Sequence, residues 1–527
     1  MIRGELIELL KKKGFEGKVD HPGVEKFGDY AVRADVDLEP DDLIEKTEKV
    51  AGFTNIFIKK EALLKEVEKL NYEIELKNEL ATHGKGKTMV IDYSAPNIAK
   101  PFGIGHLRST DIGQAIYNIY KILGWKCIGD NHLGDWGTQF GKLIVAIKKW
   151  NEKAVEELSI DDLERLYVKF HTEAEKNPEM EDEAREWFVK LENGEAEAKD
   201  IWQKCIEISL KEFDKVYEVL GVKIDQTLGE SFYLDKMPAV IEAMEKKGIT
   251  KKSEGAEIIE FKNMSPAMVK KSNETTTYFT RDMATVKYRI EKWKPDLIIY
   301  EVGSDQILHF RQVFETAKML GYRANFVHVA HGMMRWATGK FSTRKGDTIH
   351  LSEVIEKAME EAKKIAPENT KEKIMAVAIG AIKFNDLSQD PKKDIIFDWE
   401  RVMSMDGNSG PYLQYTYARC QSVLEKTKIL EQKNINEVPI DFKPEEMSLV
   451  RELSKFEEKL VESAERFNPA VIAEYLLLVA RKYNEFYGKY RIIGETEEVW
   501  RIFLTKTTSS VLKLGLELLG IKTIEKM

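Results

Sequence analysis

Thr88-Met89-Val90-Ile91-Asp92 opens the stretch of sequence that decides the fold, and the turn Gly103-Ile104-Gly105-His106 follows it. From Ile112 to Leu123 the apolar residues recur with a helical period, Gly124 ends the pattern, and a second apolar run starts at Trp125. The order of strand, glycine turn, helix and strand is the unit that binds nucleotides in α/β folds. We therefore predict a nucleotide-binding α/β domain around this stretch.

The glycine turn has the chemistry of a phosphate site. Gly103 and Gly105 carry no Cβ, so the backbone can turn sharply and an anionic ligand can approach it. His106 falls in the first helical turn, beside backbone N–H groups that have no partner within the helix. Taken alone, Gly-x-Gly-His also fits an ordinary helix-capping turn.

A second pattern of strand, helix and strand lies in the later part of the chain. Leu297 to Val302 is an apolar run, a helical pattern spans Asp305 to Leu320, and Asn325 to Val329 has the composition of a strand. Two such units make a doubly wound, Rossmann-type parallel sheet, whose ligand crevice lies at the carboxyl ends of the strands.

Composition limits the classes of protein to consider. With 527 residues the chain is too long for one core, and about three domains are expected. A hydrophobic content of 43% with 32% charged residues describes a soluble globular protein, and no apolar run approaches the ~20 residues of a membrane span. Cys127, Cys205 and Cys420 lack disulfide or metal-site spacing, so we expect a protein of the reducing cytoplasm. The net charge of −9 argues against a general nucleic-acid binder.

The residues that flank the glycine turn resemble those of the arginyl-tRNA synthetases, which are class I aminoacyl-tRNA synthetases. The resemblance rests on Asp92 to Phe102 before the turn, Leu107 to Thr110 after it, and Gly134 to Phe140 beyond the second strand. The ATP motif of the family is usually His-x-Gly-His. This chain has Gly103 in place of the first His and keeps the second as His106. The resemblance implies that the turn, with Gly103, Gly105 and His106, binds ATP.

The segment Gly339 to Gly346 lies where class I synthetases carry Lys-Met-Ser-Lys-Ser, a mobile loop that holds the pyrophosphate. Phe341 replaces the Met, Thr343 replaces the second Lys, and Arg344 replaces the final Ser. By resemblance, this segment is the triphosphate loop of the chain.

Cationic residues must neutralise the phosphate charge in this site. The resemblance implies ATP contacts from Lys340 and Ser342 of the loop. In the family, a lysine at the position of Lys100 is thought to compensate when the second loop lysine is missing. We therefore expect Lys100 and His106 to act on the reacting phosphate, with Lys345 as the alternate cation.

Three residues of the second half match segments that bind arginine in the family: Tyr278, Asp282 and Gln306. A carboxylate can accept two hydrogen bonds at once from a planar guanidinium, so we predict that Asp282 recognises the arginine side chain. A site built on such pairing rejects analogues that lack the group, because its buried partners would be left unpaired. We therefore predict no editing domain.

Residues around the glycine turn complete the arginine site by resemblance. Asp92 stands where the family usually has Glu, and Ala95 replaces a frequent Ser, which leaves its backbone to contribute. Asn97 is retained for the α-groups of the substrate, and His106 is expected to contact the substrate as well as ATP.

The rest of the chain is expected to form two further domains and an insertion. A small α+β domain spans residues 1–84, the catalytic domain spans 85–395 with a helical insertion at about 142–264, and an all-α domain spans 396–527. Further expected elements are a helix at 3–13, a charged helix near 41–50, strands around 55–59, a linker at 83–87, and sheet-forming segments at 257–261 and at Tyr278. The N-terminal stretch Phe27 to Ala31 resembles the family domain that touches the tRNA elbow.

The C-terminal region begins with a second match to the family, at Phe397 to Arg401 and Gly407 to Tyr415. Helical patterns follow at 412–430, 447–466, 469–487 and 500–519, so a helical bundle is expected. In the family this domain grips the anticodon loop, where splayed bases stack on aromatic side chains. The candidate tRNA-binding residues are Tyr412, Tyr415, Tyr487 and Met527.

The resemblance covers nearly the whole chain and implies an enzyme that ligates L-arginine to its tRNA. ATP and Mg²⁺ would enter together, without a dedicated metal site on the protein, and we expect a monomer that binds no membrane. Two alternatives stay open: a catalytically inactive tRNA-binding paralogue, and a different nucleotidyl transferase that shares Gly-x-Gly-His. The retained arginine-pocket residues Tyr278, Asp282 and Gln306 argue against the first, and the helical C-terminal third argues against the second.

Overall fold

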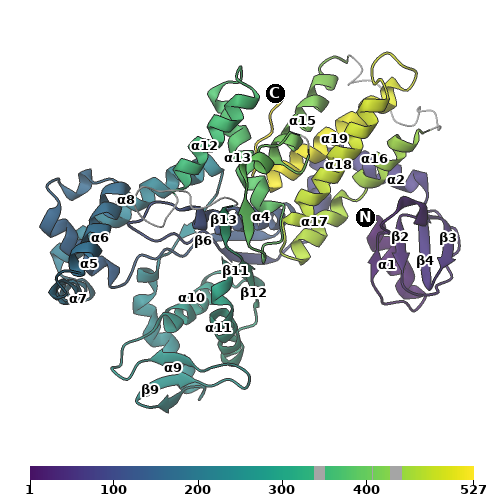
Figure 1. The fold of residues 1–527 in the computed structure, drawn as a ribbon. Coiled ribbons are helices and arrows are strands. Elements are labelled where there is room, and N and C mark those ends of the chain that lie inside the picture. The colour runs from purple at the N-terminus through teal and green to yellow at the C-terminus, as the bar shows by residue number, and fades with distance from the viewer. Residues whose placement is uncertain (337–349, 406, 428–441) are drawn as a thin grey trace.

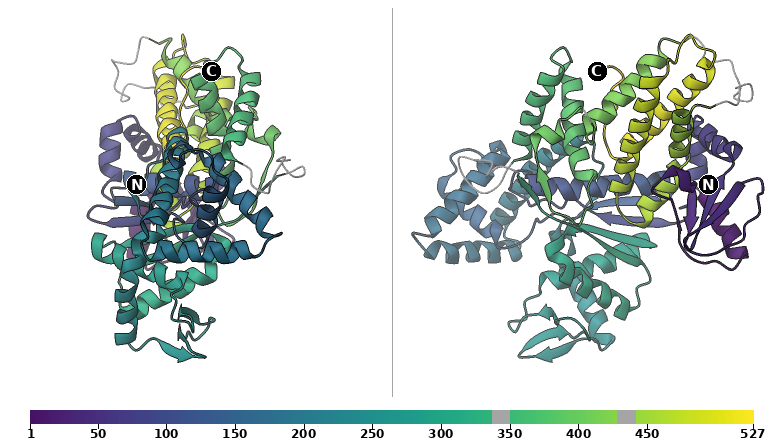
Figure 2. Two further views of the ribbon diagram at one scale, coloured as in Figure 1. Left: turned by 90° about the vertical axis from the view of Figure 1, so that its left-hand side faces the viewer. Right: turned by 45° about the vertical axis from the view of Figure 1, so that its right-hand side comes forward.

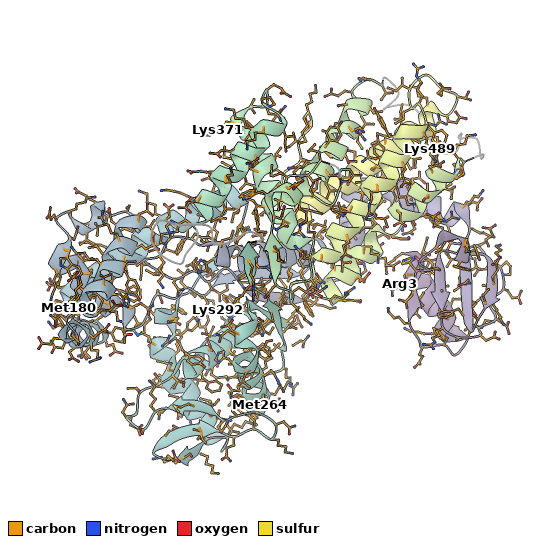
Figure 3. The ribbon with its side chains drawn as sticks, in the orientation of Figure 1. Arg3, Met180, Met264, Lys292, Lys371 and Lys489 are labelled. Carbon is orange, nitrogen blue, oxygen red and sulfur yellow. The ribbon has the colours of Figure 1, made fainter. Side chains whose placement is uncertain are left out.

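The protein is described from a computed structural model, and the residues described are 1–336, 350–405, 407–427 and 442–527. Figure 1 shows a central sheet with a helical insertion on one side, a teal lobe below it, and a helical bundle and the purple N-terminal domain on the other side. Side chains labelled in Figure 3 mark these parts: Arg3 in the N-terminal domain, Met180 in the insertion, Met264 in the lower lobe, and Lys489 in the bundle.

The central sheet is parallel throughout and has the strand order β12-β11-β5-β6-β7. Its strands are β5 (Thr88–Asp92), β6 (Lys126–Asn131), β7 (Gln226–Thr227), β11 (Leu297–Gly303) and β12 (Asn325–His331). The chain builds outward from β5 in both directions, first through β6 to β7 and later through β11 to β12. This confirms the predicted doubly wound α/β sheet, and it brings the carboxyl ends of β5, β6 and β11 together.

Helix α4 (Ile104–Ile122) connects β5 to β6 and begins at the glycine turn, with Gly103 as its N-cap. Gly124 follows the helix with φ +83°, a conformation that favours glycine. The buried Arg108 fixes the helix to later parts of the chain, because its Nε donates to Asp386 at 2.8 Å and its Nη1 donates to the carbonyl of Gly332 at 2.7 Å.

The segment after β6 forms the helical insertion. Its helices are α5 (Gln139–Trp150), α6 (Ile160–Ala174), α7 (Glu179–Glu192) and α8 (Ala196–Leu220). After α8 the chain returns to the central sheet at β7 and enters the lower lobe. That lobe holds α9 (Met237–Lys246) and an antiparallel sheet of β8 (Lys251–Ser253), β9 (Ala256–Ile259) and β10 (Ala267–Lys270). The stretch 142–264 is thus mostly helical, but it also contains β7 and ends in the strands β8 and β9.

The structure corrects one expectation in this lobe. Tyr278 does not lie in a strand but begins α10 (Tyr278–Trp293). Phe279, Met283 and Val286 are buried and recur at helical spacing, which explains the helix. Helix α11 (Ile307–Leu320) then crosses from β11 to β12.

A connecting region joins the catalytic sheet to the bundle. It contains the short strands β13 (Met334–Trp336) and β14 (Ile395–Phe397), and the helices α12 (Leu351–Ile365), α13 (Lys371–Leu387) and α14 (Trp399–Val402). The bundle follows with α15 (Gly410–Leu424), α16 (Pro444–Leu453), α17 (Phe456–Glu465), α18 (Ala470–Lys489) and α19 (Glu498–Leu518). The predicted helical domain is confirmed, although the pattern at 447–466 is divided between α16 and α17.

The N-terminal domain packs α1 (Ile2–Lys12), α2 (Lys60–Lys69) and α3 (Glu73–Leu80) with a sheet of β1 (Val19–Asp20), β2 (Tyr30–Val32), β4 (Phe53–Ile58) and β3 (Ile44–Val50). The expected charged helix near 41–50 is wrong, because this segment is the edge strand β3. A tight turn at Ala51 (φ +51°) and Gly52 (φ +81°) folds β3 onto β4, and the charged side chains of β3 face solvent.

The N-terminal domain lies against the bundle, as both views in Figure 2 show. Arg451 of α16 donates from Nε to Asp29 at 2.9 Å, and the hydroxyl of Tyr30 donates to Glu458 of α17 at 3.1 Å. Asp29 and Tyr30 belong to the stretch Phe27 to Ala31 that resembles a tRNA-contacting domain. Their side chains are buried in this interface, so the motif positions the domain on the bundle.

Candidate active site

The glycine turn places His106 in a defined protonation state. Its Nδ1 accepts a hydrogen bond from the backbone N–H of Gly103 at 3.2 Å, so the neutral ring carries its hydrogen on Nε2. The ring of Phe102 packs edge-on against the imidazole, with centroids 5.3 Å apart. Gly105 is exposed, and a Cβ built there would meet no atom within 4 Å, so a ligand can approach the backbone.

Electrostatics keep the imidazole of His106 neutral. Burial, together with the positive charge of Lys100, lowers the pKa of His106 to about 4. Lys100 itself is exposed, and its Nζ lies 5.5 Å from the centroid of the Tyr167 ring. At neutral pH the turn therefore presents a neutral N–H donor and a nearby mobile cation to an anionic ligand.

The segment between β5 and the turn is held in an unusual backbone conformation. Ser94, Ala95 and Ala99 have φ values of +74°, +44° and +62°. Such left-handed residues cost about 1–3 kcal/mol each and persist where surrounding contacts enforce them. Hydrogen bonds from side chains supply that support: the backbone N–H of Ala95 donates to Asn131 at 3.0 Å, and that of Ala99 donates to Ser209 at 2.9 Å.

This strained segment leaves Asn97 exposed beside Lys100. Asn97, Lys100, Gln139 and Tyr167 line a cavity of about 90 Å³ next to the turn. The backbone of Ala95 is held in place by its hydrogen bond to Asn131, and its contact with the substrate stays a prediction.

The expected arginine pocket lies between α10 and α11. Tyr278 is 61% exposed, and its ring centroid lies 4.8 Å from that of His309. His309 Nε2 lies 2.5 Å from Asp282 Oδ2, and His132 Nε2 lies 3.9 Å from Asp282 Oδ1. Gln306 stands at the start of α11, where its amide donates to Asp305 at 2.7 Å.

Asp282 is ionised in this environment. Burial alone would raise the pKa of its carboxyl, but the hydrogen bond from His309 and the interactions with His309, His132 and Arg281 hold that pKa below its usual value. Its neighbours His132 and His309 carried no signal in the sequence, because His132 directly follows β6, His309 lies on α11, and both meet Asp282 only in the fold.

Asp92 has a different partner from the one expected. Its Oδ2 accepts a hydrogen bond from Nη2 of the buried Arg289 at 2.7 Å, and Nε of Arg289 donates to Asp130 at 2.9 Å. The side chain of Asp92 is 7% exposed. Asp92 therefore ties α10 to the end of β5, and its contact with the substrate stays a prediction.

The expected triphosphate loop lies outside the described residues, and with it Lys340, Ser342 and Lys345. The chain resumes at His350, which forms an antiparallel bridge with Gly103. The backbone N–H of Leu351 then donates to the carbonyl of Phe102 at 2.9 Å. The segment that follows the loop is therefore attached to the glycine turn.

Three of the candidate tRNA-binding residues gather on the bundle. The guanidinium of Arg419 lies 4.8 Å from the ring centroid of Tyr415 and 5.0 Å from that of Tyr487, and both tyrosines are exposed. Asn484 donates to the hydroxyl of Tyr412 at 2.9 Å. Met527 packs instead against the apolar cluster that contains Ile524 and residues of α13, so the fold places it in other surroundings.

Among the described residues, no group of three or more His, Cys, Asp or Glu side chains is arranged to hold a metal ion. In the same part of the chain, no helix combines the length and the apolar character needed to cross a membrane.

Comparison with known proteins now decides the family. Residues 70–399 match the model described as tRNA synthetases class I (R), catalytic domain, and residues 413–527 match the DALR anticodon binding domain. The chain belongs to the arginyl-tRNA synthetase family. Membership of this family makes the chain a class I aminoacyl-tRNA synthetase, an enzyme that ligates arginine to tRNA.

Relatives within the family match over almost the full length. The chain is 40% identical to the arginine–tRNA ligase of Clostridioides difficile over 99% of this chain and 98% of that protein. It is 41% identical to the arginine–tRNA ligase of Halothermothrix orenii over 93% of this chain and 89% of that protein.

Solved structures of the family share the fold. The arginyl-tRNA synthetase of Plasmodium falciparum has a TM-score of 0.85 at 24% identity, over 100% of this chain and 98% of that one. The enzyme of Thermus thermophilus has a TM-score of 0.83 at 23% identity, over 100% of both chains.

Proposed function

We propose that the chain forms arginyl-adenylate from L-arginine and MgATP and then transfers the arginyl group to the 3′-terminal adenosine of its tRNA. The ionised carboxylate of Asp282 beside the exposed ring of Tyr278 is the observation that supports arginine as the amino acid. A guanidinium has only donors and a fixed positive charge, so it pairs with such a carboxylate in up to two hydrogen bonds.

In the first step the substrate carboxylate attacks the α-phosphorus of ATP. The bond from this phosphorus to the bridging oxygen breaks, and pyrophosphate leaves with that electron pair. Nε2–H of His106 and the N-terminus of α4 donate to the phosphate oxygens, and Lys100 supplies positive charge. Mg²⁺ arrives as part of the substrate and offsets charge on the triphosphate. The protein's contribution is position and charge stabilisation, without a covalent enzyme intermediate.

In the second step the 2′-hydroxyl of the terminal adenosine attacks the arginyl carbonyl, and AMP leaves. The tRNA must reach both the catalytic crevice and the bundle. Tyr415, Arg419 and Tyr487 support an anticodon contact, because exposed aromatic rings and a guanidinium plane offer stacking surfaces to unpaired bases.

The proposal also assigns roles to the three domains and to the other predicted site residues. Residues 1–84, 85–395 and 396–527 would act as the N-terminal, catalytic and anticodon-binding domains of a cytoplasmic monomer. Lys340, Ser342 and Lys345 would hold the triphosphate, and Gly103 and Gly105 would admit ATP to the turn. Asn97 would bind the α-groups of arginine, and Gln306 would form part of the arginine pocket.

An aminoacylation assay with each of the twenty amino acids and bulk tRNA tests the proposal. We expect charging with arginine and with no other amino acid. Charging of none would favour an inactive tRNA-binding paralogue, and nucleotidyl transfer to another acceptor would favour the second alternative.

A further inference from the structure

His132, at the end of β6, lies in a cluster of charged side chains beside the arginine pocket. Four carboxylates surround it: Asp130, Asp135, Glu230 and Asp282. The imidazole is mostly buried, with 14% of its side chain exposed, and its ring packs against that of Tyr233 at a centroid distance of 5.3 Å. Burial and packing against Tyr233 therefore fix the position of the His132 imidazole.

The hydrogen bonds of His132 fix which nitrogen carries the hydrogen. Nδ1 lies 3.2 Å from the carbonyl oxygen of Leu228. A carbonyl oxygen can only accept, so Nδ1 must be the donor. In the neutral ring, Nε2 is therefore an acceptor, and it lies 3.9 Å from Oδ1 of Asp282, which is also an acceptor.

Three of the four carboxylates have strong partners of their own. Asp130 accepts from Arg289 at 2.9 Å, Glu230 pairs with Arg281 at 2.6 Å, and Asp135 accepts from the hydroxyl of Ser231 at 2.6 Å. So far as the described residues show, Asp282 makes direct contacts with imidazoles alone, through His309 and His132. The carboxylate of Asp282 thus forms no ion pair with a Lys or Arg among the described residues, and it can pair with a cationic ligand.

His309 supports the same arrangement from the other side. Its Nε2 donates to Asp282 Oδ2 at 2.5 Å, and its Nδ1 is buried without a hydrogen-bond partner among the described residues. His309 therefore orients the carboxylate of Asp282 through Oδ2 and leaves Oδ1 facing His132.

We propose that His132 is a further substrate-binding residue, whose Nε2 accepts a hydrogen bond from the guanidinium that Asp282 binds. The inference rests on the proposed function and deepens it. Two acceptors 3.9 Å apart, with no hydrogen between them, suit a nitrogen with two hydrogens placed to donate to both. The guanidinium, which has donors on every nitrogen and no acceptor, meets this requirement.

The test measures arginine binding to the full-length chain with tRNA present, by calorimetry at pH 8. His132→Leu removes the acceptor and should weaken arginine binding roughly 10- to 100-fold at pH 8, as expected for a lost hydrogen bond to a charged group. The KM for ATP should stay within a few-fold of the wild-type value.

His132→Gln is the matched variant, because its side-chain oxygen can accept a hydrogen bond in place of Nε2. It should bind arginine within a few-fold of wild type at pH 8.

Two results overturn the inference while the proposed function stands: His132→Leu with wild-type arginine affinity, or His132→Gln with an arginine affinity as low as that of His132→Leu. If His132→Leu fails to fold, a loss of arginine affinity in a folded His132→Gln protein overturns the inference. Failure of the wild type to bind arginine at all would overturn the proposed function itself.

Discussion

Arg289 donates from Nη2 to Asp92 Oδ2 at 2.7 Å, inside the protein, and this contact joins the helix that carries Asp282 to the strand that leads to the glycine turn. The guanidinium also bridges to Asp130, whose register partner on β5 is Asp92. One cation thus holds the carboxyl ends of two central strands and α10 together. The arginine pocket and the nucleotide turn share this buried support.

The first prediction concerns this support. Arg289→Met should lower the free energy of unfolding by about 3–5 kcal/mol, because it leaves two buried carboxylates without their cation. Adding Asp92→Asn and Asp130→Asn should recover part of the loss, since the uncompensated charges are then removed. Urea unfolding of the three proteins measures this. An Arg289→Met protein within 1 kcal/mol of wild type would contradict it.

The second prediction concerns Asp282. Asp282→Asn keeps the shape of the side chain but removes the charge that pairs with the guanidinium. The KM for arginine should therefore rise far more than the KM for ATP. Steady-state kinetics with each substrate varied in turn provide the comparison. Equal changes in both constants would show that Asp282 does not recognise the arginine side chain.

The third prediction concerns tRNA. By resemblance to the family, bound tRNA organises the activation site, so that macromolecular binding completes the catalytic arrangement. ATP–pyrophosphate exchange with arginine should stay near background until tRNA is added. Brisk exchange in the absence of tRNA would refute this.

The fourth prediction concerns Lys100. It is tethered beside the glycine turn, so it loses less entropy on engaging the phosphates than a lysine on a long loop. Lys100→Ala should slow adenylate formation ~10²- to 10³-fold, with little change in tRNA affinity. Single-turnover kinetics measure the step. If Lys345→Ala abolishes activity while Lys100→Ala stays within a few-fold of wild type, the loop supplies the charge.

The fifth prediction concerns the protonation of His106. Its pKa of about 4 lies below the unfolded value of 6.5, so the folded protein binds fewer protons in that window. This contribution to stability is present above pH 6.5 and is lost as the pH falls toward 4. Lys100→Ala should raise the pKa of His106, because it removes a nearby positive charge, and an NMR titration of the imidazole would detect the change.

A matched control for this titration is Lys142→Ala. Lys142 is one of the charges that lower the pKa of His171, in addition to burial, and it does not act on His106. The control should move the titration of His171 and leave that of His106 in place. A similar response of His106 to both variants would point to a general change in the fold.

The parts of the fold that local patterns describe could be predicted from the sequence. The unit from β5 through α4 to β6 has a short apolar strand, a change to helical period and a terminating glycine, all within one segment. The edge strand β3 could not be predicted in this way. Its alternating charges look helical, and its pairing with β4 depends on the turn at Ala51 and Gly52.

The same distinction between local patterns and long-range contacts holds for the site. Tyr278, Asp282 and Gln306 could be named because their segments match the family, and their roles in binding arginine stay predictions. The surroundings of Asp282 could not be predicted, because His132 and His309 are separated from it in the sequence. The ion pair of Asp92 with the buried Arg289 could not be predicted either, because the two residues are 197 positions apart.

The contact between Asp29 and Arg451 spans 422 residues of chain. At ~5–20 residues per second, a ribosome needs roughly 20 to 80 s to make that stretch. During this interval the emerging N-terminal domain exposes Asp29 and Tyr30 to water, and the surface that will cover them has not yet been synthesised. The contact between the N-terminal domain and the bundle therefore forms only after almost the whole chain has been synthesised.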